Sequence, residues 1–344
     1  MTRTAVVLFN LGGPDRPEAV QPFLQNLFGD PAIIGLPGFL RLPLARLISK
    51  RRAKVAARIY EQMGGGSPLL PLTRAQAEAL EAALADLGGA RVFIAMRYWH
   101  PLADETARAV KDWGAARVIL LPLYPQYSTT TTGSSLADWK RAAAAAGLVA
   151  ETRAVCCYPM EAGLVEAQAA LIRPALAEAA AKGKPRLLFS AHGLPEKVVL
   201  SGDPYQWQVE QTAAKVADAL ALPDLDWLVC YQSRVGPLKW IGPSTEAEIE
   251  RAGRDGVPLV VVPIAFVSEH SETLVELDIE YAEKAHAAGV PAYHRVPALG
   301  TAAPFIAGLA RLVREALARD TAIGGDGGQR LCPASCRRCA MAGA

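Results

Sequence analysis

Short runs of apolar residues recur along the chain and alternate with longer segments in which alanine and charged residues mix. Each run is bounded by turn residues, and apolar positions follow one another rather than alternating with polar ones. Such runs are typical of parallel strands that helices cover on both faces. The chain is therefore predicted to be an α/β protein with doubly wound parallel sheets. The predicted strands lie at 6–9, 91–96, 118–121, 187–189, 227–230 and 259–264, with a further apparent strand at 150–158.

Two of the predicted strands end in similar sequences. Residues 7–14 read VLFNLGGP and residues 187–195 read LLFSAHGLP. Each apolar strand thus leads into a polar residue, a glycine and a proline, and this echo predicts two similar halves. Ligands of open parallel sheets bind beyond the carboxyl ends of the strands, so the ligand site is expected in a cleft between the halves.

The composition excludes several classes of protein. The 344 residues, 51% of them hydrophobic, suffice for two domains of ordinary size. A net charge of +2, from 36 basic and 34 acidic residues, gives no field that would favour nucleic acid. The best candidate for a membrane span, 33–48, is interrupted by prolines and arginines. No signal sequence precedes the first apolar strand, which favours the cytoplasm.

The expected organisation has three parts. An N-terminal α/β half at 1–155 is followed by a C-terminal α/β half at 156–322. A flexible glycine-rich linker with a cysteine-containing tail then occupies 323–344.

The segment after the strand at 259–264 has the most informative pattern. Ser268 is suited to cap a helix, and Glu272, Glu276 and Glu280 follow at four-residue spacing, which places them on one helical face. Carboxylates this close repel one another unless water, protons or a cation intervene, so the alternative to a site is an ordinary solvated acidic face. His270 favours the site, because it puts an imidazole beside the first carboxylate at a strand end.

Other polar and aromatic residues follow further strands. His192 comes directly after the strand at 187–189, where it could accept a proton or simply be a structural histidine. The segment 123–135 brings two tyrosines and many hydroxyl groups to another strand end, and Arg97 and Tyr98 follow a third. A cation and planar rings at one sheet edge would suit a flat substrate.

Together these segments resemble the ferrochelatase family over nearly the whole chain, from Val6 to about Val313. The motifs of the resemblance occur in family order at 10–14 (NLGGP), 64–68 (GGGSP), 124–128 (YPQYS), 190–192 (SAH), 202–205 (GDPY), 232–237 (QSRVGP) and 269–272 (EHSE). The resemblance implies two similar α/β halves that enclose a porphyrin cleft. It further implies insertion of ferrous iron into protoporphyrin IX to give haem.

The resemblance also assigns roles to the residues of the site. His192 is implied as proton acceptor or metal contact, with Glu272 acting beside it and His270 and Glu269 in support. Glu276 and Glu280 would conduct the cation or protons, since oxygen ligands suit a transient divalent ion. The residues implied to line the macrocycle are Leu11, Arg97, Tyr98, Tyr124, Ser128 and Trp240.

Four other functions compete with this interpretation. Coproporphyrin-using relatives carry a tyrosine where this chain has Leu11, which favours protoporphyrin. A chelatase for another metal and tetrapyrrole would be expected to pair histidines, whereas this chain pairs His192 with Glu272. A porphyrin-binding or haem-binding protein without catalysis would need no base. A nucleotide enzyme is disfavoured, because residues 11–14 lack both the glycine spacing and the lysine of phosphate-binding loops.

The segment 33–52 has two interpretations. Residues 33–40 resemble the hydrophobic lip of the family, and Lys50, Arg51 and Arg52 give it a basic flank. Apolar residues beside a basic cluster suit shallow contact with the inner membrane. The alternative is an ordinary core helix with a solvated end. The oligomeric state stays open, because a lip could equally contact another subunit.

Cysteines crowd the tail. Cys332, Cys336 and Cys339 have a spacing that lets several thiolates face one ion or cluster. Some members of the family hold a [2Fe-2S] cluster with tail cysteines and one internal cysteine. The internal ligand of the animal enzymes corresponds to Thr129, so either Cys156 or Cys157 is expected to replace it. Zinc and unligated thiols are the alternatives, and Cys230 is expected to pack in the core.

Overall fold

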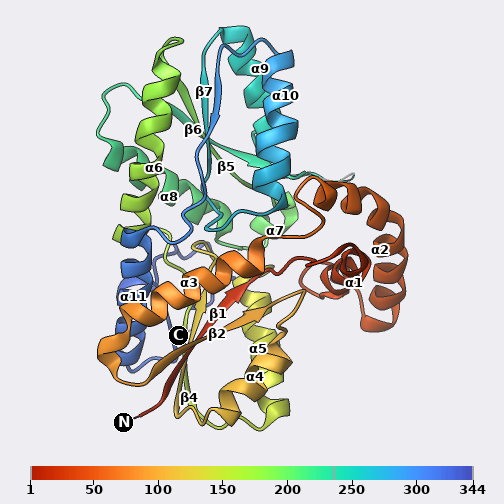
Figure 1. Ribbon diagram of the computed structural model, residues 1–344, viewed down its shortest axis with the longest axis vertical. Coiled ribbons are helices and arrows are strands. Elements are labelled where there is room, and N and C mark those ends of the chain that lie inside the picture. Colours follow the sequence, from red (N-terminus) through yellow and green to blue (C-terminus); the bar gives the residue numbers. More distant parts are fainter. Residues whose placement is uncertain (1, 235, 237, 343–344) are drawn as a thin grey trace. The chain divides into compact units, whose positions relative to one another are not determined.

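The computed structural model describes residues 2–234, 236 and 238–342. The chain forms two compact units (Figure 1). Unit 1 contains Met1–Cys157 and Leu309–Arg330, and unit 2 contains Tyr158–Gly308 and Leu331–Ala342. Val235 and Pro237 of the motif at 232–237, and the last two residues of the predicted tail, lie outside the described residues.

Unit 1 is built on a five-stranded parallel sheet with the order β2-β1-β3-β4-β9. Its strands are β1 (Thr4–Asn10), β2 (Ala90–Met96), β3 (Arg117–Pro122), β4 (Glu151–Val155) and β9 (Ile323–Gly324). Its helices are α1 (Val20–Gly29), α2 (Gly38–Glu61), α3 (Leu69–Ala83), α4 (Ala103–Asp112) and α5 (Thr132–Ala146), with short 3-10 turns at Pro17–Ala19, Ala85–Leu87 and Asp326–Gly328.

Unit 2 is built on a four-stranded parallel sheet with the order β6-β5-β7-β8. Its strands are β5 (Arg186–His192), β6 (Asp226–Gln232), β7 (Leu259–Pro263) and β8 (Tyr293–Arg295). Its helices are α6 (Ala162–Ala180), α7 (Glu196–Leu200), α8 (Tyr205–Leu220), α9 (Thr245–Asp255), a π-helix (Glu272–Glu280) and α10 (Tyr281–Ala287). Helix α11 (Ala303–Ala318) starts in unit 2 and ends in unit 1.

The two sheets repeat one strand order. In each, the first strand lies between the second and the third, and the fourth follows the third. The echo between 7–14 and 187–195 therefore reflects two similar halves, with β1 equivalent to β5. In both sheets the strand order reverses beside this strand, where ligands of such sheets bind at the carboxyl ends.

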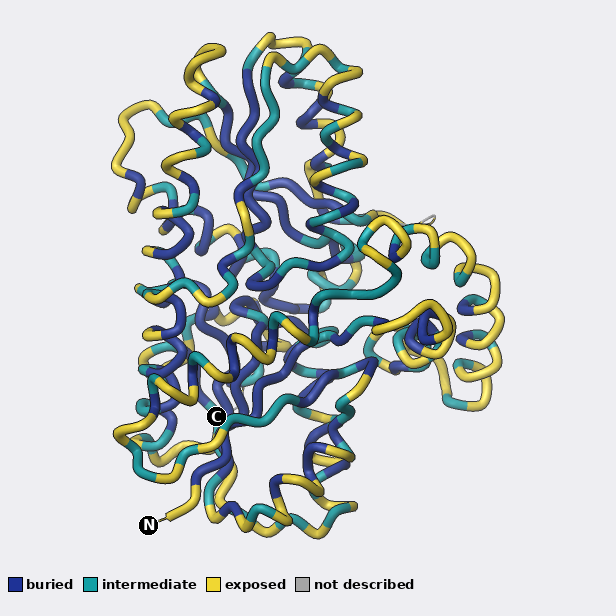
Figure 2. The backbone as a smooth tube through the Cα atoms, in the orientation of Figure 1, coloured by how far each residue is buried: buried dark blue, intermediate teal, exposed yellow. Residues whose placement is uncertain are grey.

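Helices cover both faces of the sheet in unit 2 (Figure 1). Leu187 and Phe189 of β5 pack with α6 and α8, while Leu188 between them packs with α9 and α10. Every residue of β1 and of β7 is buried, as Figure 2 shows in dark blue. The uninterrupted apolar runs thus correspond to strands covered on both faces, as predicted.

The structure differs from the predicted organisation after residue 308. From Leu309 the chain belongs to unit 1 again, because β9 adds to the edge of the sheet of unit 1 beside β4. The glycine-rich segment is consequently not a free linker: Ile323 and Gly324 pair with Ala154 and Val155. The cysteine-containing segment Leu331–Ala342, which we call the tail segment, belongs to unit 2.

Candidate functional site

The carboxyl ends of β5, β6 and β7 carry the candidate acid-base groups of unit 2. His192 is the last residue of β5, and Gln232 is the last residue of β6. The loop after β7 leads to His270 and then to the π-helix, which begins at Glu272. The parallel sheet of unit 2 thus gathers residues that are 80 positions apart in the sequence.

His192 and Glu272 form the central contact. The imidazole Nδ1 lies 2.8 Å from Oε2 of Glu272. Burial opposes protonation of His192, but the charge and hydrogen bond of Glu272 outweigh it and raise the pKa of the imidazole above 6.5. Burial likewise opposes ionisation of Glu272, yet the nearby His192 holds the pKa of this carboxyl below its usual 4.5. The pair therefore favours an imidazolium beside a carboxylate.

Glycine allows close packing in the turn after His192. A Cβ atom at Gly193 would lie 3.0 Å from the carbonyl oxygen of Gln232 and 3.3 Å from the indole of Trp240. The Gly193 N–H donates to the same Gln232 carbonyl at 2.9 Å. Trp240 also forms an antiparallel bridge with Pro195. The predicted residue Trp240 thus packs directly against the turn that carries His192.

Glu276 lies behind the central pair and accepts several hydrogen bonds. Its carboxylate receives the N–H of Ser233 at 2.8 Å, the Ser233 hydroxyl at 2.5 Å, the Gln232 amide at 3.0 Å and the Tyr281 hydroxyl at 3.0 Å. The Ser233 hydroxyl is also 3.4 Å from Oε2 of Glu272. Burial and the charge of Glu272 raise the pKa of Glu276. The two carboxylates therefore share the Ser233 hydroxyl as a donor.

Gln232 and Ser233 are site residues that the sequence reasoning missed as individuals. Gln232 is fully buried, accepts from the Ser190 hydroxyl at 2.8 Å, and donates to the Glu272 carbonyl at 3.0 Å. Ser233 has φ of 60°, in the left-handed region that costs a non-glycine residue about 1–3 kcal/mol. This conformation aims both its N–H and its hydroxyl at Glu276. Their position after a strand could have identified them, by the rule that singled out His192.

The four-residue spacing of the glutamates falls on a π-helix rather than an α-helix. Glu272 and Glu276 are half-buried, while Glu280 at the far end is exposed. π-helical turns occur frequently at functional sites. The predicted series of carboxylates thus runs from beside His192 to the protein surface.

His270 and Glu269 occupy the edge of this cluster. His270 is buried, with Nε2 3.9 Å from Oε2 of Glu272, and burial holds the pKa of the imidazole below 6.5. Glu269 forms an ion pair with Arg295 at 2.5 Å and accepts the Ala298 N–H at 2.8 Å. Burial opposes ionisation of Glu269, but these donors keep its pKa below the usual value. His270 is thus a neutral neighbour of the pair, whereas Glu269 anchors the loop.

In unit 1, Arg97 belongs to a buried ionic network. Its guanidinium contacts Asp30 at 2.9 Å and Asp138 at 3.6 Å, and its Nε donates to Ser134 at 2.7 Å. Asp30 also accepts the Tyr98 hydroxyl at 2.7 Å. Because Asp30 caps the end of α1, the network ties α1 to β2 and α5.

The other predicted substrate residues of unit 1 differ in exposure. Tyr98 is 1% exposed and packs with α1, so it contributes to the core. Ser128 is fully buried, and its hydroxyl accepts the N–H of Thr130 at 3.1 Å. Leu11 and Tyr124 are half-buried at the ends of β1 and β3.

The comparisons with known proteins identify the family. The sequence profile described as Ferrochelatase matches residues 3–317. The chain belongs to the ferrochelatase family. It is 60% identical over 341 residues to the ferrochelatase of Phenylobacterium zucineum, covering 98% of each chain. It is 59% identical over 320 residues to that of Caulobacter vibrioides NA1000, covering 92% of this chain and 91% of the relative. The protein is accordingly a metal chelatase.

Solved structures show the same fold at low identity. SirB from Bacillus subtilis with Fe3+ aligns with a TM-score of 0.54 and 14% identity, covering 92% of this chain and 96% of SirB. The predicted chelatase-like arrangement of two parallel-sheet halves is thereby confirmed.

The tail cysteines of this family member are buried in unit 2. Cys332, Cys336 and Cys339 are each 6–7% exposed. A hydrogen bond with the Cys339 thiol and burial raise the pKa of Cys332, whose sulfur also accepts the Gln208 amide at 3.0 Å. Three buried sulfurs in one short segment suit a thiolate-bound group. Within the described residues, however, no three His, Cys, Asp or Glu side chains already converge as a metal site.

The remaining cysteines lie elsewhere. Cys156 and Cys157 belong to unit 1, and their sulfurs are 3.3 Å apart. Cys230 is fully buried and accepts the Thr245 hydroxyl at 3.2 Å, and burial raises the pKa of its thiol to about 12. Cys230 therefore packs in the core, as predicted.

The lip of this chain exposes apolar side chains. Phe39 is 77% exposed and Leu42 58%, in the first turns of α2, and Figure 2 marks much of this helix as exposed. An ordinary core helix is excluded by this exposure. In the described part of the chain, no helix is both long and apolar enough to span a bilayer.

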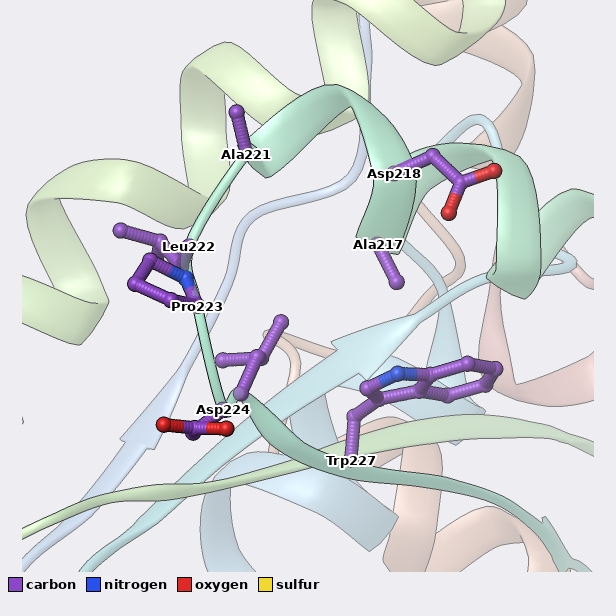
Figure 3. A pocket seen from close by; sticks show the side chains of 8 residues that line it. Ala217, Asp218, Ala221, Leu222, Pro223, Asp224 and Trp227 are labelled. Atoms are coloured by element: carbon purple, nitrogen blue, oxygen red, sulfur yellow. The ribbon is translucent and has the colours of Figure 1, made fainter.

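A surface pocket of about 520 Å³ lies away from the acid-base cluster (Figure 3). It is lined by Ala217–Asp218, Ala221–Leu225 and Trp227. These residues lie at the end of α8 and the start of β6, whereas Gln232 ends that strand. The pocket thus opens at the opposite end of β6 from the candidate site.

The Asp30 and Arg97 pair is expected to stabilise unit 1 strongly. Arg97→Met leaves the Asp30 carboxylate, 2% exposed, without its cation, and should lower the free energy of unfolding by about 3–5 kcal/mol in urea denaturation. Arg141→Met is the control: Arg141 pairs with Asp104 and Asp138 but is 54% exposed, so its loss should cost below about 1 kcal/mol. Equal losses in the two variants would contradict a structural role for Arg97.

Proposed function

We propose that this ferrochelatase-family protein inserts Fe2+ into protoporphyrin IX and that His192 accepts a pyrrole proton. The contact of 2.8 Å between His192 and Glu272, at the carboxyl ends of β5 and β7, carries the proposal. Insertion exchanges two pyrrole protons for one divalent cation, so it needs a base, an exit for protons and a route for the metal. This cluster offers groups for each task.

The base is the neutral form of His192, which arises when the imidazolium favoured by Glu272 gives up its proton. Its Nδ1 faces Glu272, and the side chain keeps 39% of its surface exposed, so Nε2 is the nitrogen that takes the proton. The Glu272 carboxylate stabilises the resulting imidazolium. The two pyrrole protons pass through His192 in turn and leave along Glu272, Glu276 and Glu280 towards the surface. The same carboxylates offer oxygen ligands to the incoming Fe2+. His270 lies beside Glu272 and helps to orient its carboxylate.

The macrocycle is bound by groups from the predicted set. In unit 1, Leu11 and Tyr124 supply apolar and aromatic surface, and the fully buried Ser128 supports the loop through its contact with Thr130. In unit 2, Trp240 supplies an aromatic ring beside the turn that carries His192. Arg97 and Tyr98 have an indirect role: both bind Asp30 and thereby hold α1 against the end of β2. Leu11 in place of a tyrosine favours protoporphyrin IX over coproporphyrin. Comparing initial rates with the two porphyrins tests this preference.

The tail segment would hold a [2Fe-2S] cluster. Cys332, Cys336 and Cys339 would provide three thiolates, and either Cys156 or Cys157 would provide the fourth. Such a cluster supplies a one-electron redox centre, and no step of insertion passes through it. A zinc ion on the same thiolates would give a protein without visible absorption.

The exposed lip contacts the inner membrane. Phe39 and Leu42 would enter the bilayer surface, and the basic side chains Lys50, Arg51 and Arg52 further along α2 would face anionic lipid. Such contact would bring the site near an apolar porphyrin substrate. Sedimentation with anionic vesicles, compared with Phe39→Ser, measures this contact.

Anaerobic mixing with Fe2+ and protoporphyrin IX tests the main proposal. Porphyrin fluorescence should fall as haem absorption grows, and a red-brown resting spectrum would indicate the cluster. Tight porphyrin binding without haem formation would make the protein a carrier instead.

A further inference from the structure

The tail segment docks on the first turns of α8. The Gln208 amide donates to the Cys332 sulfur at 3.0 Å, and Gln208 is fully buried. Just before the helix, the carbonyl of Gly202 accepts the Arg338 N–H at 3.0 Å. Both contacts lie within unit 2 and within a few residues of one helix start.

Gly202 allows this docking by its lack of a side chain. Its φ is 101°, and a Cβ atom there would lie 2.9 Å from the backbone nitrogen of Arg337. A residue other than glycine would be strained and would push the tail segment away. The helix start and the tail segment are therefore fitted to each other by backbone approach as well as by Gln208.

The same helix start contacts the base. Tyr205, the first residue of α8, donates its hydroxyl to the carbonyl oxygen of His192 at 3.1 Å. Its N–H is held by Asp203 at 3.0 Å, and the side chain is 7% exposed within the main core of unit 2. Tyr205 thus fixes the backbone from which the imidazole projects.

Tyr205 and Gln208 lie three residues apart, which places them on one side of α8. One contacts His192 and the other contacts Cys332. We propose that Tyr205 is a positioning residue for His192, and that the tail segment acts on His192 through Gln208 and this first turn of α8. This inference rests on the function proposed above. The contacts of Gln208 and Tyr205 give the route by which a change in the tail segment alters the position of His192 and so regulates iron insertion.

Single substitutions test the two contacts. Tyr205→Phe should lower kcat about 3- to 10-fold, with the KM values for porphyrin and Fe2+ unchanged, because a misplaced base slows only the chemical step. Gln208→Leu should lower kcat in the same way, by about 3-fold. Gln206→Leu is the matched control on the same helix. The Gln206 amide donates its hydrogen bond to the exposed Glu210 and not to the tail segment. Tyr293→Phe, which removes a similar bond to the Leu277 carbonyl, controls for lost stability.

A double-mutant cycle tests the route. If the tail segment acts through Tyr205, Gln208→Leu should have no further effect on kcat in the Tyr205→Phe background. Multiplication of the two effects would overturn the coupling. A rise in KM for porphyrin, or a kcat loss in Tyr205→Phe no larger than in Tyr293→Phe, would overturn the positioning role.

A second measurement does not depend on iron insertion. In protein with 15N-labelled histidine, the imidazole signals of His192 should shift in Tyr205→Phe and in Gln208→Leu, but not in Gln206→Leu. Unchanged signals would overturn the proposal even in an active enzyme. Shifted signals in a protein that inserts no iron would instead refute only the proposed function.

Discussion

Replacing His192 by alanine is expected to lower kcat for iron insertion by about 10³-fold, with porphyrin affinity nearly unchanged. The imidazole of His192 is 39% exposed and accepts a proton in its neutral form, whereas Glu272 is held ionised and His270 is buried. Stopped-flow haem formation measures kcat, and porphyrin fluorescence measures affinity. His286→Ala, at an exposed position of α10, should behave like the unaltered chain.

The metal distinguishes two roles for His192. If the imidazole accepts a proton, the loss in His192→Ala should be similar with Fe2+, Co2+ or Zn2+, because the proton comes from the porphyrin. A loss that changes strongly with the metal would assign His192 to metal contact. Unimpaired turnover would remove it from the mechanism.

Replacing Glu272 by glutamine is expected to lower kcat by about 10²-fold and to shift the pH dependence of the rate. Glu272 raises the pKa of His192 in the folded protein, so Glu272→Gln should lower that pKa. Because the base must be neutral, the acid limb of the kcat/KM profile should move to lower pH. Glu283→Gln on exposed α10 is the control. A profile that keeps its acid limb would contradict the assignment of that limb to His192.

The same pair makes stability depend on pH. His192 has a raised pKa, so its contribution is complete below about pH 6.5 and is lost as pH rises through the folded value. Glu272 has a lowered pKa, so its contribution is present above about pH 4.5 and is lost as pH falls through the folded value.

Pattern alone was sufficient for the central strands and their helices. Strands such as β1, β3, β5 and β7 are runs of apolar residues whose side chains are buried on both faces of the sheets. β8 and β9 were missed because they are three and two residues long and lie at sheet edges. Such short strands form where the tertiary structure offers a partner, and their sequences carry no signal for it.

The site was predictable where chemistry follows a strand. His192 and the segment 269–272 stand out for that reason, and the structure brings His192 and Glu272 together. Ser233 could be recognised only by its position after a strand, because the left-handed backbone that directs it at Glu276 is not evident from its sequence. Arg97 and Tyr98 were expected to face the substrate, whereas both side chains bind Asp30. Asp30 lies 67 residues before Arg97 in the chain, so these contacts could not be read from the sequence.

The late return of the chain to unit 1 has a consequence for biosynthesis. On the ribosome, β4 stays an open edge until β9 emerges, which takes about 10–30 s at roughly 5–20 residues per second. An open edge invites pairing with other nascent chains. Glu151 and Arg153 place opposite charges on this strand, and Arg153 later binds the carbonyls at the end of α11. These charges disfavour pairing of the open β4 edge with other chains. Arg153 then helps to hold α11 in place, so that β9 can pair with β4.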